Sequence, residues 1–101
     1  MSHMSTKKIK IVERKLGREG AAGMAYNKKD EKKKSYRKKF GTIEVDPRVA
    51  EVHGTNKDYM DTIVHEGIHM IDPIMHENDV ADFATRLTDI LWKAGYRKVL
   101  L

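Results

Sequence analysis

Apolar and polar positions alternate in the first half of the chain and recur at helical spacing in the second half. The alternation covers residues 7–16 and 40–46, and a period of two is typical of a strand that buries one face. In the second run, Ile43 and Val45 would face the core and Thr42 and Glu44 the opposite side. Residues 21–27 are a weaker candidate, because alanine and glycine have low strand propensity. We expect residues 21–27 and 40–46 to pair as a hairpin.

A first helix is predicted from about residue 56 to residue 71, with an apolar stripe of Met60, Ile63, Val64, Gly67 and Ile71. Thr55 and Asp58 form a capping box at its start. Asp72-Pro73 ends it, because the residue before a proline is disfavoured in helical conformation.

A second helix is predicted from about His76 to Ala94. Its apolar face would comprise Val80, Phe83, Ala84, Leu87, Ile90, Leu91 and Ala94. Gly95 is a suitable C-terminal cap, and Trp92 is expected to pack on the sheet.

These elements predict an α+β fold, in which a small antiparallel sheet of about three strands packs on two antiparallel helices. The short segment between the helices forces the second to fold back on the first. Residues 1–4 have the character of a vector remnant, which leaves residues 5–101 as a single domain.

The composition excludes several classes of protein. The chain has no cysteine, so neither disulfides nor thiolate zinc sites are available. No apolar run is long enough to cross a membrane, and a cytoplasmic location is the simplest expectation. Oligomeric state is left open.

The net charge of +5 is concentrated in residues 28–39, the basic segment. Such a segment could bind nucleic acid or an acidic partner. The other interpretation, a solvated loop, is favoured because only Tyr36 and Phe40 offer rings for base stacking.

The most specific chemical signal is His65-Glu66-Gly67-Ile68-His69, an H-E-x-x-H pattern on the first predicted helix. Histidines four residues apart lie on one face of a helix, so His65 and His69 can direct two imidazoles at one ion. Both fall off the apolar stripe and would face a cleft. The pattern predicts one Zn²⁺ ion per chain, with Glu66 as the general base that takes a proton from water.

A catalytic zinc site normally has a third protein ligand. The antiparallel second helix would bring its first residues opposite His69, which leaves four candidates: Asp72, His76, Glu77 and Asp79. His76 is chemically the better ligand but could instead cap the helix. Asp72 could accept a hydrogen bond from a ligating imidazole.

Residues 55–87 resemble the zincin metallopeptidases, in particular the ImmA/IrrE-type group and small phage-encoded enzymes. The resemblance consists of the H-E-x-x-H helix followed by Glu77-Asn78-Asp79-Val80-Ala81-Asp82-Phe83-Ala84, where that group has Glu-x-x-Ala-x-x-Phe-Ala. It implies that Glu77 is the third metal ligand. The metzincin pattern is absent, because Ile71 and Met75 occupy the positions of its glycine and histidine.

The expected function is therefore hydrolysis of a protein or peptide by a zinc metallopeptidase. The alternative is a zinc-stabilised binding or regulatory module that contacts nucleic acid through the basic segment. The donor that stabilises the oxyanion is open among Tyr59, Tyr96, His53 and His76. Residues 96–101 could also cover the cleft and keep the protein latent.

Overall fold

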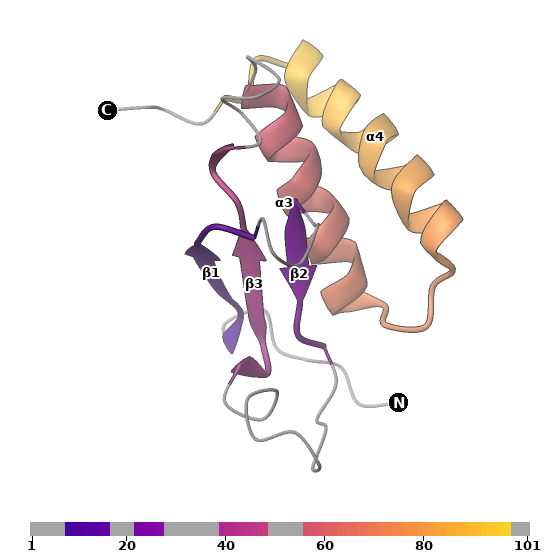
Figure 1. Ribbon diagram of the computed structural model, residues 1–101. Coiled ribbons are helices and arrows are strands. Elements are labelled where there is room, and N and C mark those ends of the chain that lie inside the picture. Colours follow the sequence, from indigo (N-terminus) through magenta and orange to yellow (C-terminus); the bar gives the residue numbers. More distant parts are fainter. Residues whose placement is uncertain (1–7, 17–21, 28–38, 49–55, 98–101) are drawn as a thin grey trace.

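The computed structural model describes residues 8–16, 22–27, 39–48 and 56–97. Within these residues, three strands are followed by two helices: β1 (Lys10–Glu13), β2 (Gly23–Ala25), β3 (Thr42–Val45), α3 (Asn56–Ile71) and α4 (Glu77–Lys93). Figure 1 shows α3 lying against the sheet and α4 running antiparallel beside it. The fold is α+β, as predicted.

The sheet is mixed, and in this respect the expected antiparallel sheet is wrong. Its order is β1-β3-β2, with β3 antiparallel to β2 but parallel to β1. The chain reverses direction between β1 and β2 and again between β2 and β3, so β1 and β3 run in the same direction. Strand β3 takes the central position because three of its four side chains are buried, whereas every residue of β1 is exposed. The predicted hairpin of β2 and β3 is confirmed.

The hydrophobic core lies between β3 and α3. Ile43 and Val45 pack there with Tyr59 and Met70, and the core extends to three partly buried residues, Ile9, Ala25 and Ile63. The predicted division of β3 into two faces is confirmed, because Ile43 and Val45 share this side.

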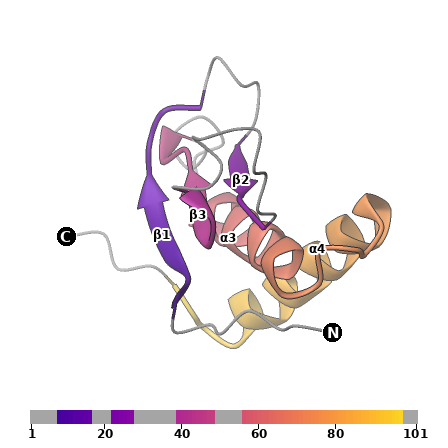
Figure 2. The ribbon, with the colours of Figure 1, turned by 90° about the horizontal axis from the view of Figure 1, so that it is seen from below.

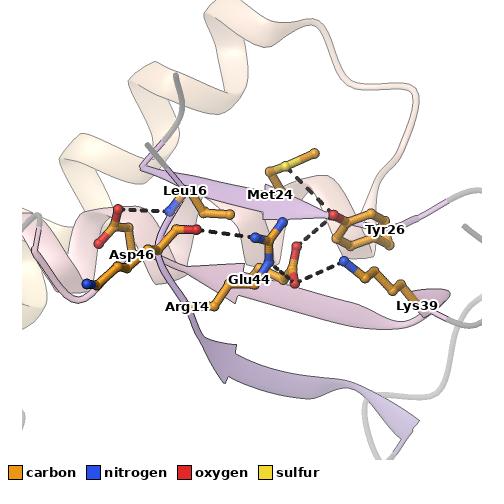
Figure 3. Close-up of polar contacts among 8 residues, drawn as sticks. Arg14, Leu16, Met24, Tyr26, Lys39, Glu44 and Asp46 are labelled. Atoms are coloured by element: carbon orange, nitrogen blue, oxygen red, sulfur yellow. Dashed lines mark hydrogen bonds and ion pairs between the residues drawn. The ribbon is translucent and has the colours of Figure 1, made fainter. Parts of the chain in front are cut away.

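Glu44 points to the other face of the sheet and is buried, with 3% of its surface exposed. Three groups surround its carboxylate: Arg14 Nε at 2.6 Å, the Tyr26 hydroxyl at 2.6 Å and Lys39 Nζ at 3.4 Å (Figure 3). A buried carboxylate is costly unless it is paired in this way. Burial raises the pKa of Glu44, but the bonds from Arg14 and Tyr26 and the charge of Lys39 outweigh it, so the pKa is lowered.

Asp46, directly after β3, joins the segment that follows β1 to the residues that follow β3. It accepts hydrogen bonds from the Leu16 N–H at 3.0 Å and from the Arg48 guanidinium at 2.7 Å. The Arg48 bonds, followed by the Leu16 N–H, keep the pKa of Asp46 far below its usual range.

Helix α3 has the predicted bounds, but its core face was predicted only in part. Tyr59 and Met70 are its buried residues, whereas Ile71 is 67% exposed. Ile71 is the last residue of the helix and lies on a face that the sheet does not cover. Thr55, the predicted cap, lies outside the described residues.

Helix α4 packs on α3, which lies between α4 and the sheet (Figures 1 and 2). Of the broad predicted apolar face, only Val80 and Ala84 are buried, together with Thr88, which the prediction did not include. The predicted packing of Trp92 on the sheet is replaced by a contact with Arg97, whose guanidinium lies 3.4 Å from the ring centroid. Gly95 ends α4 with φ +95°, as its predicted role as a cap requires.

None of the helices in the described residues is both long and apolar enough to span a bilayer.

The lowered pKa values of Glu44 and Asp46 predict loss of stability in acid. Each carboxyl binds its proton more weakly in the folded state, so its stabilisation is complete above the unfolded pKa, near 4. That stabilisation disappears as the pH falls through the folded pKa. We expect Glu44→Gln to lower the free energy of unfolding by about 1–3 kcal/mol at pH 7, with a smaller loss near pH 3. Urea unfolding at both pH values measures this, and an equal loss at each would contradict the assignment.

Candidate metal centre

His65 and His69 lie one turn apart on α3, on the flank between β2 and α4. Their ring centroids are 4.9 Å apart, with the ring planes at 61°. The side chains are 24% and 20% exposed, so they lie at the edge of the core and remain open to solvent. The spacing of four residues places both imidazoles on one face, as the sequence predicted.

Glu77, the first residue of α4, joins the two histidines. Its Oε1 lies 2.8 Å from His65 Nε2, and its Oε2 lies 2.6 Å from His69 Nε2. The five-residue connection between Ile71 and Glu77 brings the start of α4 opposite the last turn of α3. One ligand atom from each of the three residues lies within 4.8 Å of the others.

The other predicted third ligands have different positions. His76 caps α4, because its Nδ1 accepts a hydrogen bond from the Asn78 N–H at 3.1 Å. Within the part of the chain that the structure describes, neither Asp72 nor Asp79 belongs to the group of metal-binding donors. The chain thus brings together the set that the resemblance implied, and His76 has the capping role that was left open.

Two imidazole nitrogens and one carboxylate form a donor set that zinc accepts at a catalytic site, where three protein ligands leave a position for water or substrate. Both Nε2 atoms converge on the same carboxylate, so one ion could contact all three residues. Other first-row divalent ions also accept imidazole and carboxylate ligands. The donor set alone therefore does not distinguish zinc from these ions.

Glu66 lies on the side of α3 that meets β2. A Cβ atom added to Gly23 would lie 2.9 Å from Glu66 Cγ and 2.7 Å from Thr62 Cγ2. Glycine at this position therefore lets β2 approach the helix directly beside Glu66. Burial raises the pKa of Glu66, the charges of His65 and His69 oppose this rise, and the charge of Glu77 adds to it.

Two of the suggested oxyanion donors are excluded by their positions. The Tyr59 hydroxyl donates to Glu13 Oε1 at 2.6 Å, on the core side of α3. Tyr96 follows the far end of α4, which is about 25 Å along the helix axis from Glu77. His53 lies outside the described residues, as do residues 28–38 of the basic segment and residues 98–101 of the tail. Binding of nucleic acid and latency therefore stay predictions.

The sequence did not reveal two residues that border the site, Gly23 and Asn27. In the sequence, Gly23 only weakens the prediction of a strand over residues 21–27, and nothing there indicates which side chain it meets. The Asn27 amide Nδ2 donates to the backbone carbonyl of His69 at 2.8 Å. Pro73, four residues after His69, was a usable signal, because it cannot supply the helical N–H for that carbonyl.

The roles of the adjacent residues Glu77 and His76 can be separated by substitution. We expect Glu77→Ala to weaken zinc binding by more than about 100-fold, which exceeds the range typical of outer-shell changes. His76→Ala should cost about 0.5–1 kcal/mol of stability through the lost cap and leave the dissociation constant for zinc nearly unchanged. Competition with a chromogenic chelator measures the dissociation constant. If His76→Ala lost zinc binding strongly and Glu77→Ala retained it, His76 would be the metal ligand and Glu77 would not.

No protein-family model matches the chain, and no curated protein or solved structure matches it significantly. The likeness to zincins consequently depends on the motif residues alone.

Proposed function

We propose that this protein is a zinc-dependent metallopeptidase, active in the cytoplasm on protein or peptide substrates. The observation that carries the proposal is the convergence of His65 Nε2 and His69 Nε2 on the Glu77 carboxylate, with Glu66 on the same helix. A histidine often pairs with a carboxylate without a metal, but here two imidazoles on one face of a helix share a single carboxylate, as three ligands of one ion would. The 61% exposure of the Glu77 side chain leaves the site accessible to a large substrate.

In this proposal His65, His69 and Glu77 hold the metal. Bound zinc supplies Lewis acidity, which acidifies water and polarises a carbonyl group. Glu66 accepts the proton of the attacking water and returns it to the leaving amine. The position of Glu66 suits this role, because the backbone of β2 approaches the side chain closely at Gly23 and partial burial raises the pKa of the carboxyl group.

Strand β2 offers an edge along which a substrate could bind. Two backbone hydrogen bonds flank the pairing of β2 with β3. The Asp46 N–H donates to Ala22 O at 2.9 Å, and the Tyr26 N–H donates to Thr42 O at 3.0 Å. By the alternation of an antiparallel ladder, the backbone groups of Gly23 and Ala25 point to the opposite edge. An extended peptide that added a strand there would run beside Glu66 and the two histidines.

Glu66→Gln tests the proposal, because it removes the base while keeping the size and polarity of the side chain. We expect peptide hydrolysis to fall by about 100-fold or more. Zinc content should remain at the wild-type level, because Glu66 is not one of the three proposed ligands. Cleavage of an unstructured protein such as casein, followed by mass spectrometry, gives the rate.

Hydrolysis by Glu66→Gln at the wild-type rate would refute the role of Glu66. Zinc binding without hydrolysis by the wild-type protein would refute the peptidase and leave the zinc-stabilised binding module.

A further inference from the structure

The backbone carbonyl of His69 lacks its helical partner. In an α-helix this oxygen would accept the N–H of the residue four positions later, which is Pro73 and has no N–H. The neighbouring carbonyl of Ile68 does find its partner, the Asp72 N–H at 2.8 Å. This carbonyl, in the last turn of α3, must therefore accept its hydrogen bond from water or from a side chain elsewhere in the chain.

Asn27 supplies that donor. Its side-chain Nδ2 lies 2.8 Å from the His69 oxygen, and the two residues are 42 positions apart in the sequence. Asn27 lies two residues beyond β2, and at the other end of that strand the backbone of Gly23 lies so near Glu66 that an added Cβ atom would collide with it. Strand β2 and the residues that follow it therefore approach α3 at two points, one beside Glu66 and one beside His69.

The residue before Asn27 is firmly held. The Tyr26 N–H donates to Thr42 O at 3.0 Å, and Tyr26 O accepts from the Gly41 N–H at 2.9 Å. The Tyr26 hydroxyl donates to Glu44 Oε1 at 2.6 Å, within the polar cluster of Figure 3. Tyr26 is only 5% exposed. Asn27 therefore donates from a point that the sheet fixes and not from a free loop.

We propose that Asn27 is a positioning residue for the metal site, and this inference rests on the proposed function. By fixing the His69 carbonyl, it fixes the backbone of the last turn of α3. The direction of the His69 imidazole relative to His65 and Glu77 follows from that backbone. Without the Asn27 amide, the carbonyl has only water to bond with, and the turn that ends at Pro73 is free to shift.

The test compares Asn27→Ala with Asn78→Ala. Asn78 is an exposed asparagine next to Glu77, and its side chain makes no hydrogen bond within the described residues. We expect Asn27→Ala to weaken Zn²⁺ binding by about 10–100-fold, the range typical of groups that orient a metal ligand. It should also change the visible absorption spectrum of the Co²⁺-substituted protein. Asn78→Ala should leave both unchanged. Asn27→Ser, which keeps a shorter donor, serves as a second variant if Asn27→Ala folds poorly.

Pro73→Ala provides a reciprocal test, because it restores a backbone N–H four residues after His69. In that background we expect Asn27→Ala to weaken Zn²⁺ binding by less than it does in the wild type. Urea unfolding of the metal-free variants separates a local effect on the site from a general loss of stability.

Three outcomes would overturn the inference. If the Asn27 variants bound Zn²⁺ with wild-type affinity and kept the wild-type Co²⁺ spectrum, the positioning role of Asn27 would be refuted and the metal site would stand. Equal losses in Asn27→Ala and Asn78→Ala would show a nonspecific effect. A wild-type protein that binds neither ion would refute both the positioning role and the proposed function.

Discussion

Helix α3 must pack on the core, pack on α4 and present two histidines to Glu77, and the rest of the structure depends on how its faces are divided between these roles. One face presents Tyr59 and Met70 to the core, and another packs on α4. The flank between them carries His65 and His69. Because a helix turns by a fixed angle per residue, these assignments are coupled. Moving α3 to improve the core would also turn the two imidazoles away from Glu77.

The sheet packs closely on this helix because the residues of edge strand β2 that face it have small side chains. Gly23 and Ala25 face α3, so β2 can approach Thr62 and Glu66 where larger side chains would collide. This weak strand sequence is then stabilised from the opposite face, where Glu44 binds Tyr26 and Arg14. A buried charge on one side of the sheet thus supports close packing on the other.

Local sequence signals predicted the elements well. The bounds of α3 follow from apolar spacing and from Pro73, and α4 ends at Lys93, just before the predicted cap Gly95. The order and direction of the strands in the sheet were harder to predict from the sequence. Placing β3 between β1 and β2 depends on which strand gains most from burial on both faces, and no local pattern of β1 shows that it lies parallel to β3. The apolar face of α4 was overestimated, because periodicity shows which residues share a face but not how much of it a neighbour covers.

The site was predictable where spacing alone determines geometry, as for His65 and His69. Glu77 needed the resemblance to zincins, since His76 is adjacent and chemically suitable, and its role as a cap depends on backbone angles. Asn27 required the tertiary structure, although Pro73 had marked the carbonyl that it binds.

The most direct test of the account is the zinc content per chain, measured by elemental analysis on the wild type and on His65→Ala after zinc loading and dialysis. The account predicts one zinc ion per wild-type chain and none in the variant. A wild-type protein without metal, or a variant that keeps it, would contradict the assignment of His65, His69 and Glu77 as a metal centre.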